Sequence, residues 1–471
     1  MTRAATYDHE ASREVEGNTN RTSHEGIFMQ VRRGRTFAAL ISLATAATIT
    51  LTNAPGAQAD VQAPTHGKLI GSFTPQDLAS HPVPHLTSLM KASAERCAPL
   101  PAGSTARNAG ATTACIQVSG SSGSSPAQSS RLGTAQEAAA TCSVTSPGSY
   151  YYHRHDYCLN SLKVTYTEFN EQNPAEILGT GVLTVSSSAA LSASSGQWQE
   201  SQTVTLAEAT GLVKELSVGL TASCNGSCTA TVPTAWAGSR LLTLGQSASG
   251  SVTYLATPGA GLQSNITTSY DLNVTQPGAV PIVKDVTWSN PRQVRCDTTF
   301  ANNTSTGCII PSIRAQLILP LSTYGAAAAT YAWAENNLID HWGADDSPLQ
   351  RLANENTQTA NRTNTCGTGA SRSFTPLPAT VPDDSCDEYP FAGSYQGGSN
   401  GALCADIIPL LQNGVWNFYQ DPNAPAVTFN EPCVRGHVPS TQNSAAGGKL
   451  GSNNQTERVL DLEKFDVVVT A

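Results

Sequence analysis

Hydrophobic and polar residues alternate in short runs between about residues 140 and 300. Leu162, Val164 and Tyr166 share one side of such a run, and the polar residues between them fall on the other side. A period of two is typical of a strand with one buried face. The alternation recurs in three further runs separated by turn-rich breaks, at 182–185, 216–220 and 270–274. This pattern predicts an antiparallel β-sandwich-like, disulfide-bonded region over residues 140–308.

The pattern changes after residue 308. A short strand at Leu317–Leu319 precedes a segment in which apolar residues recur at helical spacing, at Ala327, Tyr331, Ala334 and Leu338. Further along, a short helix and a turn lead into a strand in which Phe465, Val467 and Val469 alternate. Residues 309–471 are therefore predicted to form a small mixed α/β domain, and the fold class of the whole chain is expected to be α+β.

Residues 1–59 are predicted to be an N-terminal extension and a signal peptide. Arg32, Arg33 and Arg35 precede the apolar run Phe37–Leu51, and Ala57-Gln58-Ala59 supplies a small-x-small cleavage pattern. The apolar run is shorter than the about 20 residues that a membrane-spanning helix needs. We therefore expect a secreted, extracellular protein with no stable membrane association. Residues 60–139 are rich in Pro, Ser and Gly, and they are predicted to form a loosely structured linker.

The chain contains twelve cysteines, and all of them follow the cleavage pattern. An even number of cysteines in an exported protein predicts structural disulfides. Metal binding by cysteine is the weaker interpretation, because no CxxC pair exists and the nearest approach is Cys224-x-x-x-Cys228. We expect the cysteines of the last domain to be oxidised, namely Cys366, Cys386, Cys404 and Cys433.

Two histidines in the β-rich region, His153 and His155, would share one face of a strand, as two metal ligands do. Ligand sets normally converge from several segments of a chain, and no third ligand is evident near these residues. The neighbourhood is rich in tyrosine, which favours ordinary packing. We therefore expect both histidines to be structural.

The segment CDEYPFAGSYQGG, residues 386–398, is a concentrated polar motif in an otherwise Ser/Thr/Ala-rich chain. Two further segments flank it, LILPLSTYGAAAATYAWA at 317–334 and QNSAAGGKLG…RVLDLEKFDVVV at 442–469. In this order the three segments resemble the secreted bacterial NucA/NucB-type deoxyribonucleases. The resemblance covers about residues 309–471, and the β-rich region lies outside it.

The resemblance implies a metal-dependent endodeoxyribonuclease that hydrolyses DNA with little sequence preference and uses Mg²⁺ or Mn²⁺. It assigns Asp387 as the catalytic carboxylate, with Glu388 beside it, and Asn443 as a polar active-site residue. The same three residues are the candidate metal ligands. Gln396 stands where family members often carry an acid, and Gln442 stands where an aspartate can occur. If those acids bind metal in relatives, this departure predicts weak metal binding or an inactive protein.

The chemistry of these residues is compatible with phosphodiester hydrolysis. The reaction needs an activated water and a cation that offsets charge on the phosphoryl oxygens. One or two carboxylates suffice to hold a hydrated Mg²⁺ or Mn²⁺. Because neighbouring side chains of an extended segment point to opposite sides, Asp387 is the first choice and Glu388 the second. His437, six residues before Asn443, is a candidate general base.

Charge limits how the chain could bind DNA. The whole chain has a formal net charge of −9, and residues 309–471 carry eight Lys and Arg against sixteen Asp and Glu, or 8 − 16 = −8. Nonspecific DNA binders gain affinity by neutralising phosphates. We therefore expect weak binding of the DNA substrate through the metal and a local patch, for which Arg435 and Lys449 are candidates.

Two alternatives remain open at this stage. A catalytically weakened relative would bind a cell-surface polymer through the β-rich region, as an interaction protein and not as an enzyme. Another secreted hydrolase, such as a glycosidase, would use Asp387 together with a distant acid. The sequence implies no protein partner for any of the three.

Overall fold

The computed structural model describes residues 67–78, 80–119, 146–277, 286–300 and 305–471. The predicted signal peptide lies outside these residues. The chain divides into two compact units, Met1–Gln58 and Ala59–Ala471, and all described residues belong to the second unit. Within them, no helix combines the length and the apolar character that crossing a membrane requires.

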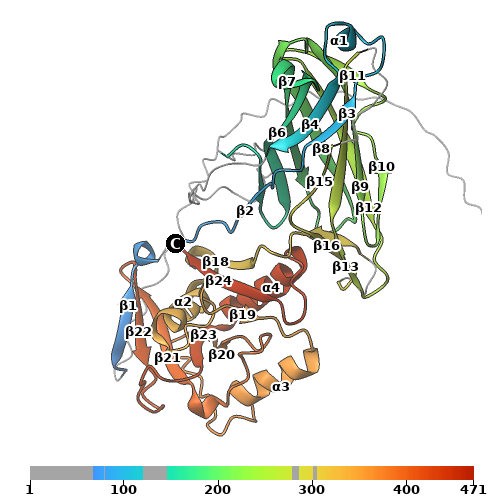
Figure 1. The fold of residues 1–471 in the computed structure, drawn as a ribbon. Helices are drawn as coiled ribbons and strands as arrows, with labels where there is room; N and C mark the ends of the chain where they lie inside the picture. The colour runs from blue at the N-terminus through green and yellow to red at the C-terminus, as the bar shows by residue number, and fades with distance from the viewer. Residues whose placement is uncertain (1–66, 79, 120–145, 278–285, 301–304) are drawn as a thin grey trace, which may run out of the picture. The chain divides into compact units, whose positions relative to one another are not determined.

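The β-rich region contains two antiparallel sheets that share one core (Figure 1). The strands of the larger sheet are β2 (Leu86–Leu89), β3 (Arg96–Pro99), β4 (Thr113–Ser119), β5 (Ser149–Tyr152), β6 (Asp156–Asn170), β7 (Asn173–Ala190), β8 (Gln197–Gly211), β10 (Cys228–Val232) and β12 (Ser247–Ala256). The strands of the smaller sheet are β9 (Glu215–Cys224), β11 (Arg240–Thr243), β14 (Thr268–Thr275) and β15 (Val286–Ser289).

The larger sheet has the strand order β10-β12-β8-β7-β6-β4-β3, with β5 pairing with both β2 and β6, and the smaller one has the order β11-β9-β14-β15. Side chains alternate between core and solvent, so that Val204 of β8 and Leu220 of β9 belong to the same buried cluster. The alternation in the sequence therefore predicts this part of the fold correctly. A separate three-stranded sheet follows, in the order β13 (Gln263–Ile266), β16 (Val294–Asp297) and β17 (Gly307–Ile309).

The C-terminal region is mixed α/β. Its helices are α2 (Leu321–Asn337), α3 (Glu355–Thr365) and α4 (Ser440–Thr456). One sheet has the order β1 (Leu69–Phe73), β22 (Val415–Gln420), β21 (Ala405–Gln412), β23 (Val434–Pro439) and β20 (Asp384–Tyr389). A second sheet has the order β18 (Ala315–Pro320), β24 (Lys464–Thr470) and β19 (Leu349–Gln350). Of the residues predicted for the alanine-rich helix, Ala327, Tyr331 and Ala334 lie in α2 and Leu338 is its C-cap. The residues predicted for the last strand lie in β24.

Helix α2 is the central element of the C-terminal core. It is alanine-rich, which favours the helical state, and Ala327, Tyr331 and Trp333 are all buried within the core cluster. Both α2 and α4 begin directly after a proline that ends a strand, Pro320 and Pro439 respectively. Proline is well tolerated there because the N–H that it lacks would have no helical partner.

The expectation of a loosely structured linker over residues 60–139 is wrong for the part that the structure describes. Strands β1 to β4 lie in this segment, together with the short helices η1 (Pro75–Asp77) and α1 (Thr105–Asn108). Strand β1 pairs antiparallel with β22 of the C-terminal region, and the ring of Phe73 lies 5.4 Å from that of Phe418. A Ser/Gly-rich composition indicates low local structural preference, but it carries no signal for such long-range pairing.

Five disulfides have both cysteines among the described residues. They are Cys97–Cys115, Cys224–Cys228, Cys296–Cys308, Cys366–Cys386 and Cys404–Cys433. The expected oxidation of the four cysteines of the last domain is confirmed.

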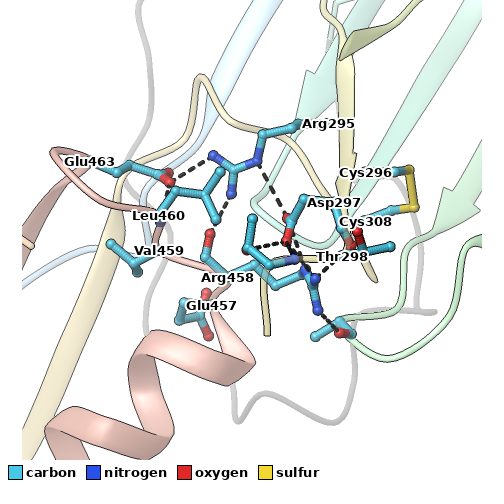
Figure 2. Close-up of polar contacts among 12 residues, drawn as sticks. Arg295, Cys296, Asp297, Thr298, Cys308, Glu457, Arg458, Val459, Leu460 and Glu463 are labelled. Atoms are coloured by element: carbon cyan, nitrogen blue, oxygen red, sulfur yellow. Dashed lines mark hydrogen bonds and ion pairs between the residues drawn. A yellow bond between two sulfur atoms is a disulfide. The ribbon is translucent and has the colours of Figure 1, made fainter. Parts of the chain in front are cut away.

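Buried arginines hold the segment that follows α4, at 457–463 (Figure 2). Arg458 donates to both carboxylate oxygens of Asp297 in β16, at 2.9 Å from Nε to Oδ2 and 2.5 Å from Nη2 to Oδ1. Arg295 Nη1 lies 2.7 Å from Glu463 Oε2. Arg154 donates to the backbone oxygen of Glu457, at 2.7 Å from Nε. The chain just beyond α4 is therefore fixed by charge-assisted hydrogen bonds.

Candidate active site

The first four residues of the motif at 386–398 lie in strand β20, at the edge of the five-stranded sheet (Figure 1). This strand pairs antiparallel with β23, so that Asp387 lies opposite Gly436 and Glu388 lies opposite Arg435. Successive side chains of a strand point to opposite faces. Asp387 accordingly contacts α2, whereas Glu388 lies near α3. The two acids thus face opposite sides of the sheet, as the extended sequence predicts.

Asp387 is buried against α2, with 4% of its surface exposed. The Tyr331 hydroxyl donates to its carboxylate, at 2.9 Å from Oδ2 and 3.1 Å from Oδ1. Burial, with a further contribution from Glu388, raises the pKa of Asp387 well above its ordinary value, and the Tyr331 hydrogen bond opposes this. In the part of the chain that the structure describes, no cationic side chain pairs with Asp387. By contrast, buried Asp406 pairs with an arginine.

Glu388 occupies the other face, where 14% of its side chain is exposed. Arg362 of α3 approaches it, with 4.0 Å between Arg362 Nε and Glu388 Oε1. Burial raises the pKa of Glu388, and the positive charge of Arg362 partly offsets that rise. Because the Arg362 side chain is 56% exposed, this face presents a guanidinium to solvent beside a mostly buried acid.

Asn443 lies in the first turn of α4 and is brought next to β20. Its Nδ2 donates to the backbone oxygen of Cys386 at 2.9 Å and to Ser385 Oγ at 3.1 Å. Cys386 immediately precedes Asp387. The structure therefore places Asn443 against the backbone of the residue that precedes the candidate carboxylate, although Asn443 and Asp387 belong to different elements.

The two glutamines that stand where an acid is expected both hold backbone groups. Gln396 Oε1 accepts from the Gln350 N–H at 2.9 Å. Gln442 Oε1 accepts from the Ala326 N–H at 2.6 Å, at a kink in α2 where Gly325 has a φ of 48°. This φ is one that L side chains rarely adopt, so a residue other than glycine would be strained at this position. The Gln442 hydrogen bond ties α4 to α2.

His437, the candidate general base, is not brought together with Asp387. His437 pairs with Cys386 across β20 and β23, and paired residues point to the same face of a sheet. Because Cys386 and Asp387 are neighbours in β20, His437 lies on the face opposite to Asp387. The imidazole is fully buried, with Nδ1 2.7 Å from Asp384 Oδ2 and Nε2 3.6 Å from Asp421 Oδ2. Burial lowers the pKa of His437, but the two aspartates outweigh this effect and the pKa is raised. The strand alternation therefore separates this histidine from the candidate carboxylate.

The candidate phosphate contacts have different environments. Arg435 is fully buried and donates to both oxygens of Asp406, at 2.8 Å from Nε and 2.7 Å from Nη2. It is therefore not available to a phosphate in this structure. Lys449 lies on α4 and is partly exposed.

Sequence reasoning missed Tyr331 and Arg362 as neighbours of the two acids. Tyr331 appears in the sequence as one more position of an apolar helical stripe, and its hydroxyl is the one signal that distinguishes it from Ala and Leu. Sequence reasoning also missed a second, partly buried acid on the α2 face. Tyr389 donates to Glu335 Oε1 at 2.9 Å, and burial, against the lowering effect of this hydrogen bond, raises the pKa of Glu335 to about 8.

The donor set at Asp387 fits a hard, hydrated cation. Carboxylate and amide oxygens are ligands that Mg²⁺ accepts, and this ion keeps several waters. A buried acid with no counter-charge is costly, and a cation would offset that cost. Asp387 is the residue that would hold it, and Asn443 would support it through the backbone of β20, whereas Glu388 faces the other side of the sheet.

Clusters of three converging protein ligands support no metal site among the described residues, either at Asp387 or elsewhere. Within the described ranges, the one group of three His, Cys, Asp or Glu with converging ligand atoms is Glu95 with Cys97 and Cys115, and these cysteines form a disulfide. His153 and His155 bind different acids, since His153 Nδ1 lies 3.0 Å from Asp156 and His155 Nε2 lies 2.9 Å from Glu457.

A comparison with protein families finds a match in this region of the chain. The model of the family described as deoxyribonuclease NucA/NucB matches residues 339–415. The match includes α3, β20 and β21, with Asp387 and Glu388, and ends before α4 and Asn443. No curated protein matches the chain. The resemblance read from the motifs is therefore confirmed, and the C-terminal region of this chain carries a match to the deoxyribonuclease NucA/NucB family.

Proposed function

We propose that the protein is a secreted, metal-dependent deoxyribonuclease that hydrolyses extracellular DNA with little sequence preference. The family match supports a deoxyribonuclease function for the C-terminal region. The observation that carries the finer proposal is the buried carboxylate of Asp387, which has no cationic partner among the described residues and lies within the matched segment. Asn443 stands beside the same strand.

The residues around Asp387 have separate roles in this proposal. Tyr331 orients the carboxylate through its hydroxyl. Asn443 fixes the backbone of β20 through the Cys386 oxygen. When bound, Mg²⁺ or Mn²⁺ supplies positive charge that offsets the charge of the phosphoryl oxygens. Because a carboxylate and a phosphate repel each other, we assign Asp387 to holding the ion or accepting a proton from water, and not to contacting the phosphate directly.

Few basic groups are available for DNA, which supports weak and nonspecific binding. Arg435 is buried in an ion pair, whereas Arg362 beside Glu388 is exposed and Lys449 of α4 is partly exposed. The affinity for DNA falls with salt in proportion to the number of phosphates that a protein neutralises. We therefore expect cleavage to depend less steeply on salt than it does for a strongly basic nuclease.

The disulfides support secretion, because such bonds persist in oxidising compartments and are rare in the cytosol. The exported location remains a proposal, as the predicted signal peptide lies outside the described residues. A released nuclease that acts on free DNA needs no protein partner.

The direct test is cleavage of supercoiled plasmid by the full chain, produced in an oxidising compartment. The assay compares added Mg²⁺, added Mn²⁺ and a chelator, on two plasmids of unrelated sequence. The proposal expects nicking and linearisation of both plasmids with metal and none with the chelator. Cleavage that persists in the chelator would reject the metal dependence, and absence of cleavage under every condition would favour a binding protein instead.

A further inference from the structure

A disulfide joins α3 to the strand that carries both candidate acids. Cys366 caps the end of α3, and Cys386 lies in β20 immediately before Asp387. The Cys366 sulfur also lies 3.6 Å from Glu388 Oε2. The disulfide is therefore next to Asp387 in the sequence and close to Glu388 in space, the two acids of the proposed site.

Two other contacts converge on the same disulfide. Arg362 lies one helical turn before Cys366 and approaches Glu388 on the α3 side. On the α4 side, Asn443 Nδ2 donates to the backbone oxygen of Cys386. A shift of Cys386 would therefore move Asp387 and Glu388 and change the hydrogen bond of Asn443. A shift of Cys366 would move the end of α3 that carries Arg362.

The disulfides differ in how far they are accessible to a reductant. Cys366 and Cys386 are both partly exposed. In the other disulfide of the C-terminal region, Cys404 is 5% and Cys433 is 3% exposed. A dissolved thiol can attack a sulfur only where it can reach it. A dissolved thiol therefore reaches the link at the proposed site more readily than it reaches Cys404–Cys433 in the folded protein.

We propose that the Cys366–Cys386 disulfide positions the Asp387–Glu388 segment for catalysis, and that its reduction by a dithiol switches the proposed nuclease off while the fold persists. Each event consumes one dithiol. The S–S bond breaks, two electrons and two protons pass from the dithiol to the two sulfurs, and two protein thiols and the cyclic disulfide of the reductant result. Reoxidation restores the link. This inference rests on the proposed function.

The fold should survive reduction because other bonds hold α3 in place. Asn364 Nδ2 donates to the Gly398 oxygen at 2.6 Å, and Thr365 Oγ1 donates to the Ser399 oxygen at 2.8 Å. The hydrophobic core around α2 contains no residue of α3. Loss of the link would therefore loosen β20 and the end of α3 without opening the core. A displacement of about 1 Å at reacting groups can cost on the order of 10²-fold in rate.

The test compares wild type with C366S/C386S and with C224S/C228S. Cys224 and Cys228 are likewise partly exposed and disulfide-bonded, but they belong to the β-rich region, so this pair is a control matched for exposure. All three are assayed for plasmid cleavage with Mn²⁺ and for thermal unfolding. Wild type is also treated with dithiothreitol, alkylated, freed of reductant and assayed, with the labelled cysteines identified by mass spectrometry.

We expect C366S/C386S and wild type alkylated at Cys366 and Cys386 to lose about 10²-fold in rate while still unfolding cooperatively. We expect C224S/C228S to cut like oxidised wild type. Full activity of wild type labelled at both cysteines, or of C366S/C386S, would overturn the inference. If C366S/C386S fails to fold, the reduced wild type decides alone, and its loss of the folded state on reduction would also reject a switch. Inactive oxidised wild type would reject the proposed function itself.

Discussion

The buried pair Asp297–Arg458 should contribute more to stability than any surface ion pair of this chain. Asp297 is completely buried and Arg458 is 2% exposed. Asp297→Asn keeps the shape of the side chain but removes the charge that two hydrogen bonds from Arg458 recognise. Each hydrogen bond to a charged group contributes about 1.5–3 kcal/mol, and removing one partner of a buried pair costs about 3–5 kcal/mol. Two such hydrogen bonds amount to about 3–6 kcal/mol, which overlaps the about 3–5 kcal/mol of the second route, so we expect a loss of about 3–5 kcal/mol for Asp297→Asn.

Removing the arginine instead of the aspartate should cost less stability, because the remaining charge keeps a partner. In Arg458→Met, Asp297 retains a second cation, since Arg295 Nε lies 3.7 Å from Asp297 Oδ2. Burial raises the pKa of Asp297, but Arg458 and Thr299 outweigh it and the pKa is lowered. The stabilisation by this carboxylate is therefore present at neutral pH and is lost as the pH falls through its lowered pKa.

The assay is urea unfolding at neutral pH of wild type, the two single variants and the double variant, followed by tryptophan fluorescence. Residues in direct contact typically couple by about 0.5–3 kcal/mol in such a cycle. We expect the double variant to be destabilised by clearly less than the sum of the two single losses. Additive losses, or a loss below about 1 kcal/mol for Asp297→Asn, the range of surface ion pairs, would refute the reasoning.

Three further predictions concern the C-terminal region. The aspartate partners of His437 raise its pKa above the ordinary 6.5. Their pairing with His437 therefore stabilises the fold most below pH 6.5, and this stabilisation is lost as the pH rises through the raised pKa. In urea unfolding, the destabilisation by His437→Gln should accordingly shrink as the pH rises. Asn443→Ala should raise the Mn²⁺ concentration needed for half-maximal cleavage about 10–100-fold, which is the typical cost of losing a group that supports a metal ligand. An unchanged Mn²⁺ concentration would show that Asn443 does not support the ion site. Glu388→Gln should reduce the cleavage rate less than Asp387→Asn does, since Glu388 faces away from α2, and the opposite order would exchange their roles.

Local patterns in the sequence predicted the elements whose periodicity is visible over a few residues. The alternation at Leu162–Tyr166 lies in β6, and the helical spacing from Ala327 to Leu338 follows α2 and its C-cap. The opposite orientation of Asp387 and Glu388 followed from the geometry of an extended chain alone. The oxidation of the cysteines followed from their even number and the signal peptide pattern.

The sequence could not show which distant segments pair. Strand β1 joins β22 across more than three hundred residues, and His437 is separated from Asp387 by the register between β20 and β23. A one-residue shift of that register would reverse which face His437 occupies. The same limit hid Tyr331, because only the packing of α2 on β20 brings its hydroxyl to Asp387. A fragment that begins at residue 309 would lack β1 and the partners of Arg458, so we expect it to be less stable than the full chain.

The most direct test of the central claim compares plasmid cleavage by Asp387→Asn with that by wild type, in Mn²⁺ and alongside a thermal melt. The change is nearly isosteric, and it replaces a carboxyl whose pKa burial already raises, so the melt should stay close to that of wild type. Loss of a general base or of an ion ligand should lower the cleavage rate by about 10²–10⁴-fold. A variant that melts like wild type and cuts at an unchanged rate would contradict the account.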